Sequence, residues 1–434
     1  MSPLLIKKIT TALILIYLSP YCFANSVSIN KIITSIDQHP KVVNMARKLS
    51  SQLIKTNIAR SEGPQINFST KGNLPIARNI NTNLYRNPVD DRTYIDGLIT
   101  GSMTLYDFGE LDANIAANIA LELSSELEYE DAREAILLKL FNLIIDFHRL
   151  EAIRVSLVRS ITNTNETLIQ TKQLYKSGVG TIDDVREIEL SRLDIESQLQ
   201  LLNIKREEVL QNLRYEFGFS TGKFDAIYEV ANSLNHSSPL ISNSKTLKSA
   251  RLKAIHQLKV DSIEQQISAI NATRMPNVSG VITTTFYDIA RGLNEYQVTG
   301  GVNIALPLFD SGRSDVQMQS ALNNIGIEDD KFRSIIFSKE LALEDLYRQI
   351  QSLRSVNSSN LIKQSELNEK ITRLELKQKT SNSALVAKVK TQIELDKLER
   401  DLLNYDYVVK QSNLKHLRLN ETLLSEFSQL NLNQ

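Results

Sequence analysis

Roughly 64 consecutive residues, from 111 to about 174, contain neither proline nor glycine, and their apolar residues recur at spacings of three and four. As one α-helix this segment would extend for about 95 Å, whereas helices of compact domains usually have about 8 to 20 residues. A second helical run, 182–215, follows a short break, and the pattern recurs at 315–379 and 385–427. We therefore predict two long antiparallel helical hairpins of coiled-coil character.

The composition also favours long helices. The 434 residues include only 15 glycines and 9 prolines and no tryptophan, few chain breakers for an α/β enzyme. The 50 basic and 50 acidic residues balance to a formal net charge of zero. This balance argues against a nucleic-acid partner, because binding to phosphates requires a basic face.

The hairpins belong to an internal duplication. The segments 103–109 and 303–312 read almost alike, and aligning Gly109 with Gly312 gives an offset of 203 residues that also superposes Asp107 on Asp310. Further upstream, Gly63-Pro64 matches Met275-Pro276 with an offset of 212, each after a charged helical stretch. We predict a first repeat over 25–217, a polar linker over 218–244 and a second repeat over 245–434.

Each repeat contains two predicted β-strands before its paired glycine. The clearest is 296–306, where apolar and polar residues alternate strictly over about eleven residues, the length of a transmembrane strand. The others are 65–71, 97–106 and 278–286, and aromatic residues gather near the strand ends. Four half-buried strands of an ordinary soluble sheet would show the same pattern. In a membrane, four strands cannot close a barrel within one chain, so that interpretation requires oligomerisation.

The N-terminus has the pattern of a signal peptide over residues 1–24. Lys7 and Lys8 precede a short apolar run, and Cys22 and Ala24 occupy the −3 and −1 positions of a cleavage site. Acylation of Cys22 as a lipoprotein is the alternative, but Tyr21 directly before it does not suit that processing. No later stretch reaches 18 apolar residues, so any membrane span must consist of strands.

The tip of the first hairpin, 175–185, has clear turn signals. Gly178 suits the left-handed residue that ends a helix, and Gly180 follows it. Thr181 is placed to cap the next helix, with Asp184 in the first turn, where the helix dipole favours acids. These features predict a helix–turn–helix tip and do not by themselves indicate a function.

In their order, spacing and duplication, these motifs resemble the TolC-like outer-membrane efflux and secretion channels over about 400 residues. The matching segments are Leu105–Gly109, Leu306–Asp310 with Gly312, and Tyr175 with Gly178 and Asp184. The resemblance implies a mainly α-helical protein with transmembrane β-strands. It also implies a homotrimer whose twelve strands form a β-barrel in outer-membrane lipid, continued by an α-helical tunnel across the periplasm. A periplasmic adaptor and an inner-membrane transporter would dock at the hairpin tips, and no reaction or cofactor is implied.

The second tip, 378–389, departs from this family. Gln378 stands where the family has tyrosine, and Ser381 or Asn382 stands where it has glycine. The acidic positions that line the constriction in relatives fall near Ala387 and Lys390, so an acidic ring is in doubt. One hypothesis is a gate in which Gln378 or Lys390 faces Asp184 of the neighbouring hairpin. The simpler interpretation is that Lys390 is a solvated helix residue.

Other functions find less support in the sequence. The five histidines show no metal-ligand spacing, and Gly218 to Lys223 only superficially resembles a phosphate-binding loop. No catalytic constellation is present, so we do not expect an enzyme. The main alternative is a periplasmic coiled-coil adaptor, although adaptors usually contain one hairpin. For the channel, the form of Leu105–Gly109 slightly favours type I protein secretion over small-molecule efflux.

Overall fold

The computed structural model describes residues 30–73, 94–219, 224–237, 249–287, 289–378 and 383–432. The predicted signal peptide, with Cys22, and the tip residue Ser381 lie outside these ranges. The chain divides into two compact units. The sheet unit comprises segments 47–127 and 252–332, and the hairpin unit comprises 1–46, 128–251 and 333–434.

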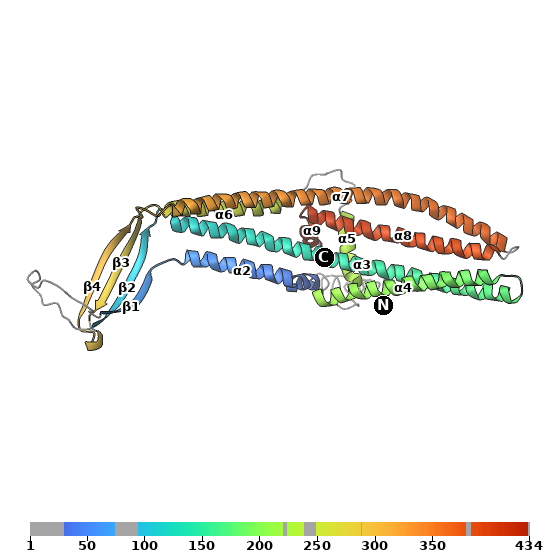
Figure 1. Ribbon diagram of the computed structural model, residues 1–434, viewed down its shortest axis with the longest axis horizontal. Coiled ribbons are helices and arrows are strands. Elements are labelled where there is room, and N and C mark those ends of the chain that lie inside the picture. The colour runs from blue at the N-terminus through green and yellow to red at the C-terminus, as the bar shows by residue number, and fades with distance from the viewer. Residues whose placement is uncertain are drawn as a thin grey trace, which may run out of the picture. The chain divides into compact units, whose positions relative to one another are not determined.

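The sheet unit contains one antiparallel four-stranded sheet in the order β1-β2-β3-β4 (Figure 1). Its strands are β1 Gln65–Asn73, β2 Tyr94–Tyr106, β3 Asn277–Phe286 and β4 Tyr296–Ala305. They lie where the alternation of apolar and polar residues predicts them. β2 and β3, one from each repeat, pair directly, so a single sheet joins the two halves of the duplication.

A helix leads into and out of each strand pair. α2 (Pro40–Arg60) and α6 (Ala250–Ala272) precede β1 and β3, and α3 (Glu110–Lys176) and α7 (Arg313–Gln378) follow β2 and β4. In the sheet unit, the side chain of Gln52 on α2 donates to Asn118 on α3. His256 on α6 stacks on Phe332 of α7 and lies 2.8 Å from Asp329. Each incoming helix is therefore paired with the outgoing helix of its own repeat.

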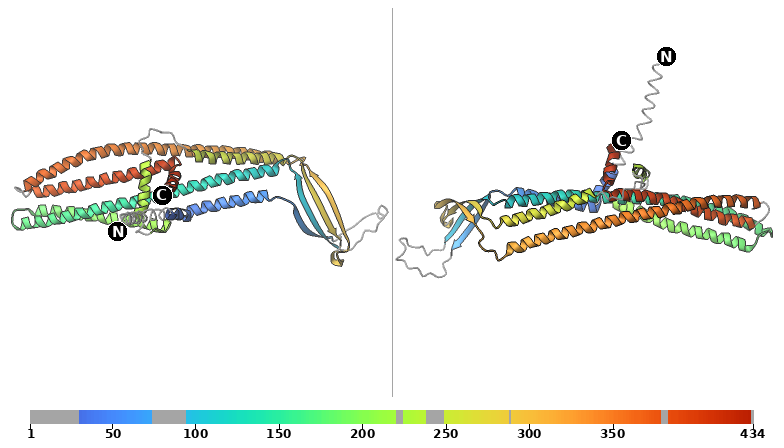
Figure 2. Two further views of the ribbon diagram at one scale, coloured as in Figure 1. Left: turned by 180° about the vertical axis from the view of Figure 1, so that it is seen from behind. Right: turned by 90° about the horizontal axis from the view of Figure 1, so that it is seen from above.

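The helical hairpins are confirmed. α4 (Ile182–Phe217) returns alongside α3, and α8 (Ser383–Leu419) returns alongside α7 (Figure 2). Ile153 and Leu157 of α3 pack against Ile195 of α4, at the periodicity from which the hairpins are predicted. Among the described helices, none combines the length and apolarity of a membrane-spanning helix.

The predicted continuous helix over 385–427 is wrong. α8 ends at Leu419, and α9 (Leu423–Leu432) begins after a break in which Glu421 has a left-handed φ of 61°. Its carboxylate accepts hydrogen bonds from the backbone N–H of Arg251 and from Lys339 Nζ, both at 2.7 Å. These contacts from distant segments hold a conformation that a glutamate rarely adopts, and they carry no local sequence signal.

The predicted polar linker over 218–244 also needs correction, because it contains the amphipathic helix α5 (Phe224–Ser237). Phe224 stacks edge-to-face on Phe147 of α3 with ring centroids 4.7 Å apart. The buried residues of α5 recur every three or four positions: Phe224, Ile227, Val230, Ala231 and Leu234. Polar residues on both sides of this short apolar stripe make the segment 218–244 polar on average. The average composition therefore does not reveal that the segment contains a core helix.

The main core of the hairpin unit surrounds the middle of α3. Leu137, Leu140, Phe141 and Ile144 are fully buried there and pack with residues of several other helices. Those partners include Leu213 of α4, Ile227 of α5, Leu417 of α8 and Phe427 of α9. Hence the helices that follow each hairpin, α5 and α9, are fastened onto the first long helix.

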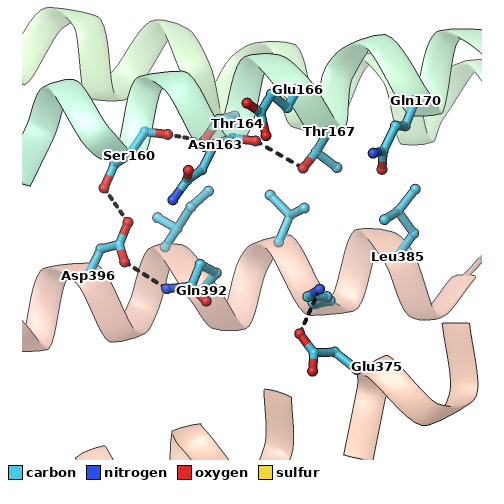
Figure 3. Close-up of a pocket in the computed structure, with 13 residues that line it drawn as sticks. Ser160, Asn163, Thr164, Glu166, Thr167, Gln170, Glu375, Leu385, Gln392 and Asp396 are labelled. Carbon is cyan, nitrogen blue, oxygen red and sulfur yellow. Dashed lines mark hydrogen bonds and ion pairs between the residues drawn. The ribbon is translucent and has the colours of Figure 1, made fainter. Parts of the chain in front are cut away.

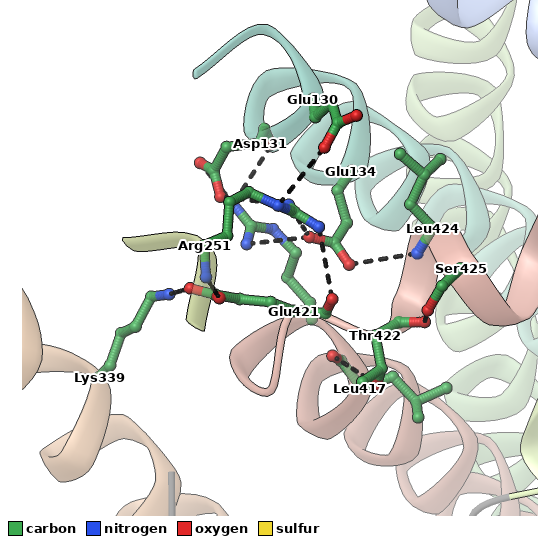
Figure 4. Close-up of polar contacts among 11 residues, drawn as sticks. Glu130, Asp131, Glu134, Arg251, Lys339, Leu417, Glu421, Thr422, Leu424 and Ser425 are labelled. Atoms are coloured by element: carbon green, nitrogen blue, oxygen red, sulfur yellow. Dashed lines mark hydrogen bonds and ion pairs between the residues drawn. The ribbon is translucent and has the colours of Figure 1, made fainter. Parts of the chain in front are cut away.

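A buried ion network lies beside this core (Figure 4). Glu134 of α3 is fully buried, and its carboxylate contacts Arg251 Nη1 at 2.6 Å and Arg418 Nη1 at 3.4 Å. It also accepts the backbone N–H of Leu424 at 3.1 Å, which ties the start of α9 to α3. A buried charge is tolerated only when it is paired and hydrogen-bonded, so this network fixes where α6, α8 and α9 meet α3.

Candidate functional site

One face of the sheet is apolar and exposed. Directly opposed residues of antiparallel strands share a face, and the pairs Phe68↔Ile99 and Ile282↔Gly101 extend this apolar face across three strands. Phe286 and Tyr296 form a ring pair at the end of the sheet where β3 ends and β4 begins. The exposed apolar members are Ile66, Phe68, Ile95, Ile99, Met103, Ile282, Tyr296, Val298, Val302 and Ile304. A continuous apolar surface of this kind marks contact with lipid or with another protein.

The opposite face of the sheet is polar and almost uncharged. The register places Thr283 opposite both Thr100 and Thr299, and hydroxyl or amide side chains fill most of the neighbouring positions. They are Asn67, Ser69, Ser102, Ser279, Thr285, Gln297 and Asn303. Lys71 and Asp96, the only charged residues of the described strands, lie directly opposite each other. This face is suited to water and carries no net charge.

The paired glycines Gly109 and Gly312 form equivalent strand-to-helix turns. Their φ angles are 86° and 77°, in the left-handed region that glycine adopts readily. Just before them, the Asp107 carboxylate accepts the N–H groups of Gly109 and Leu111, at 3.0 and 2.8 Å. Asp107 thereby caps the start of α3. The sequence comparison singled out the glycine and missed this role, although an acid directly before a helix is its signal.

Asp310 caps the start of α7 in the same way. It accepts the N–H groups of Gly312 and Ser314, both at 3.0 Å, and also the Ser314 hydroxyl. The Ser314 side chain and the backbone N–H groups of Ser314 and Gly312 lower the pKa of this exposed carboxyl. The recurrent Asp-x-Gly motif is therefore a helix cap present in both repeats.

The first hairpin tip is held together by its own backbone. Gly178 has a φ of 77°, and the N–H groups of Val179 and Gly180 both donate to the carbonyl of Leu174. A Cβ on Gly180 would lie 3.3 Å from the backbone nitrogen of Tyr175, so the turn accepts little more than glycine there. The predicted glycine positions are thus explained by the geometry of the turn.

Thr181 and Asp184 form a reciprocal capping box at the start of α4. The Thr181 hydroxyl accepts the N–H of Asp184 at 3.1 Å, and the Asp184 carboxylate accepts the N–H of Thr181 at 3.1 Å. Around this cap, the apolar side chains of Tyr175, Val179 and Ile182 remain exposed. Asp184 therefore shapes the tip, and the exposed surface next to it is apolar.

The second hairpin tip has a different basis. α7 ends at Gln378, and α8 begins at Ser383 with a buried apolar turn that includes Ala384, Leu385 and Val386. Val386 belongs to a small core with residues of the first hairpin, namely Leu168, Val185 and Ile188. The start of α8 is consequently held against the first hairpin by packing.

Lys390 reaches the first hairpin, but its ion-pair partner in the chain is Glu187 and not Asp184. Both side chains of this pair are about half exposed, so the pair contributes little to stability. The Asp184 carboxylate is engaged in its cap. Within one chain, Lys390 therefore pairs with Glu187, and a gate facing Asp184 stays a prediction.

A polar cavity of about 330 Å³ lies between α3 and α8 near the tips (Figure 3). At its wall, Ser160 of α3 donates to the buried carboxylate of Asp396 on α8, and Gln392 Nε2 donates to the same carboxylate at 2.8 Å. Further hydroxyl and amide residues of α3 line it, namely Asn163, Thr164, Thr167 and Gln170, together with charged and apolar residues. This site was not predicted from the sequence. Its signal is the run 160–167, where hydroxyl and amide residues dominate a helix that they do not favour.

The remaining candidates show structural roles. The described residues contain no group of three or more His, Cys, Asp or Glu side chains able to hold a metal ion. Gly218 is the left-handed C-cap of α4, and its N–H donates to the carbonyl of Arg214. The segment from Gly218 to Lys223 that superficially resembles a phosphate-binding loop therefore begins at the end of a helix. His148 stacks on Tyr228, and burial lowers its pKa.

Comparison with known proteins finds matches among solved structures only. No protein-family model matches the sequence, and neither does any curated protein. Solved structures do match. Outer membrane protein VceC from Vibrio cholerae has 16% sequence identity and a TM-score of 0.72, covering 91% of this chain and 96% of that one.

Two further matches are outer membrane channels. CmeC from Campylobacter jejuni has 12% identity and a TM-score of 0.68, covering 93% of this chain and 89% of that one. MtrE from Neisseria gonorrhoeae has 12% identity and a TM-score of 0.70, covering 91% and 89%. These matches each cover at least 91% of this chain, and they do not support the adaptor interpretation. The chain has the fold of the TolC-like outer-membrane channels.

Proposed function

We propose that this chain is a subunit of an outer-membrane channel that exports cargo and catalyses no reaction. The main support for this proposal is the different character of the two faces of the sheet. Its exposed apolar face suits lipid, and its uncharged polar face suits a water-filled passage. The two functions require two faces of opposite character on the same strands, which the register provides.

Self-association is part of the proposal. Among the described residues, the outer edges of β1 and β4 have no strand partner, and open edges are not tolerated in lipid. With four antiparallel strands, β4 of one copy runs antiparallel to β1 of the next, so identical copies can close a ring. Exposed apolar residues on the helices also favour contact between copies, among them Leu190, Ile204, Phe337 and Ile362. Following the resemblance, we propose a homotrimer with a twelve-stranded barrel.

We further propose that the hairpin tips bind a periplasmic adaptor and an inner-membrane transporter. The first tip offers an exposed apolar surface formed by Tyr175, Val179 and Ile182. The nearby cavity offers hydroxyl groups and amides for polar contacts. A partner with an apolar contact residue flanked by polar side chains would fit both features.

The test replaces, in separate variants, two neighbouring residues that lie on opposite faces of β4. Val302→Arg places a charge on the apolar face, and Asn303→Arg places the same charge on the polar face. An arginine facing lipid near the bilayer midplane costs about 2–4 kcal/mol per strand, so Val302→Arg should abolish the heat-sensitive oligomer band and the conductance steps in planar bilayers. Asn303→Arg should retain both and change only the ion selectivity. Equal effects of the two variants would contradict a channel wall.

The cargo class is tested in cells. Deleting the gene should remove a secreted protein from the medium if the sequence-based preference for type I secretion is right. Increased sensitivity to toxic small molecules, with secretion unchanged, would instead assign the channel to efflux. The Leu105–Gly109 segment on which that preference rests forms a helix-capping turn in the structure.

A further inference from the structure

The strand-to-helix junctions of the two repeats differ in charge. Four positions around each turn correspond through the offsets of the duplication. In the first repeat they form what we term the acidic junction: Glu62, Asp107, Glu110 and Asp112. In the second repeat they form the mixed junction: Arg274, Asp310, Arg313 and Asp315. Two carboxylates of the first repeat are thus replaced by arginines in the second.

The acidic junction is not neutralised by described residues of its own chain. Its four side chains line a hollow of about 580 Å³, and no described cation forms an ion pair with any of them. Partial burial, followed by the charges of Asp107 and Glu62, raises the pKa of Glu110. Arg60 at the end of α2 is not among the groups that act on it. The site therefore holds excess negative charge that favours a cation from outside the chain.

The mixed junction contains a cation without a described partner. Arg274 forms an ion pair with Asp315, and Asp310 is engaged by Ser314 and the backbone of its cap. Arg313 is exposed, and no described residue forms an ion pair with it. Counting ion pairs between described residues only, the acidic junction thus has carboxylates without a cationic partner, and the mixed junction has a guanidinium without an acidic one.

The sheet order determines which junctions can meet. β1 begins three residues after Glu62, and β4 ends shortly before Arg313, so both residues lie at the helix-proximal ends of the two open edges. When β4 of one copy is added to β1 of another, the start of α7 comes beside the end of α2 of the other copy. Arg313 of the first copy then lies beside Glu62 of the second.

The internal seam between β2 and β3 provides a comparison. There the start of α3, with Glu110, adjoins the end of α6, with Arg274. The acidic residue thus follows β2, and the basic residue precedes β3. At the seam between copies the order is reversed, because the base follows β4 and the acid precedes β1. Parallel pairing of the other open edge, β4 with β4 of another copy, would instead bring the two Arg313 residues together, two like charges. The charge pattern therefore favours one pairing of edges over another.

We propose that the subunit seam contains an ion pair between Arg313 of one copy and the acidic junction of the next, with Glu62 as the nearest carboxylate. The partner is a second copy of this chain, and this inference rests on the proposed channel function. The pairing selects the correct strand edge during assembly and neutralises the acidic junction.

Cysteine cross-linking in membranes tests the contact directly. The full chain carrying both Glu62→Cys and Arg313→Cys should form covalent dimers and larger oligomers on oxidation, and these should disappear on reduction. Each single variant and the unaltered chain serve as backgrounds. The matched control is Arg274→Cys with Asp315→Cys, an ion pair within one chain, which should form a link without any oligomer band.

A charge exchange tests the energetic role. Arg313→Glu should reduce the heat-sensitive oligomer band about fivefold, the effect of roughly 1 kcal/mol per ion pair. Glu62→Arg in the same chain should restore the oligomer. Arg354→Glu, at another exposed position on the same helix, should leave it unchanged.

The outcomes separate the two proposals. A normal oligomer without the 62–313 cross-link, together with no rescue by the charge exchange, would overturn the seam and leave the channel intact. An unaltered chain that stays monomeric in membranes would overturn both. Cross-linking with rescue supports the seam.

Discussion

The two hairpin tips occupy corresponding places in the duplication and are stabilised by different means. The first tip depends on local backbone geometry, with Gly178 in a left-handed conformation and a capping box between Thr181 and Asp184. The second tip depends on distant residues, because the start of α8 buries Val386 against the first hairpin. The two repeats therefore share the hairpin, while the described contacts next to their tips differ.

This difference also separates two roles. A tip that is closed by its own backbone can leave side chains such as Val179 exposed for a partner. A tip that is closed by packing must direct its apolar side chains inward. We therefore expect partners to recognise the first tip mainly by its side chains, and mutations at the second tip to act mainly on stability.

The largest difference is expected when a valine near each tip is replaced by aspartate. Val386→Asp buries an unpaired charge and should lower the free energy of unfolding by about 3 kcal/mol. Val179→Asp, at a side chain that is 59% exposed, should change it by no more than about 0.5 kcal/mol. Urea unfolding of the full chain in detergent, followed by circular dichroism, provides both values. Similar losses in the two variants would remove the distinction between the tips.

A smaller effect is expected from the glycine that closes the first tip. Gly178→Val forces a β-branched residue to a φ of 77° and should cost about 1–2 kcal/mol. Gly326→Ala, in the interior of α7 with no atom near its new Cβ, is the control and should stabilise the chain by about 0.5–1 kcal/mol. If Gly178→Val is neutral in the same unfolding experiment, the first tip is not held by its backbone.

The capping box should contribute about 1 kcal/mol. Asp184→Ala and Thr181→Ala remove the same reciprocal cap, so each should cost about this amount, and the double variant should cost little more than either single variant. Additive losses would show that the two side chains act independently. The measurement is again the unfolding free energy of the full chain.

The smallest effect on stability is expected from the ion pair between the hairpins. Lys390→Ala and Glu187→Ala should each change the unfolding free energy by less than about 1 kcal/mol, because both side chains are about half exposed. Closed-state conductance tests the gate hypothesis separately. An increase in Lys390→Ala and Glu187→Ala channels, but not in Asp184→Ala channels, would assign the contact to Glu187. Unchanged conductance in all three would exclude a gate at these residues.

Features that depend on neighbours in the chain could be predicted. The breaker-free run over 111–174 requires a long helix, because no residue in it interrupts the backbone hydrogen bonds. The alternation over 296–306 requires a two-faced strand, since successive side chains of a strand point to opposite sides. Gly178 and Gly312 could be recognised as turn residues because their conformation suits glycine.

Features that depend on distant residues could not be predicted. The break at Glu421 is held by Arg251 and Lys339, 170 and 82 residues away along the chain. The apolar stripe of α5 can be recognised as part of the core only when its packing against α3 is known. Asp396 and Glu134 look like ordinary solvated acids in the sequence, and their burial follows from helices that pack around them.

The sequence by itself thus determined the duplicated units, the long hairpins and the two-faced strands, because helix and strand periodicity depend on residues only a few positions apart. Only the tertiary structure decided which carboxylates are buried, which cap a helix and which of them Lys390 meets. The physical reason is that an acid has the same side chain in water, in a cap and in an ion pair. Its role depends on the partners that folding brings to it.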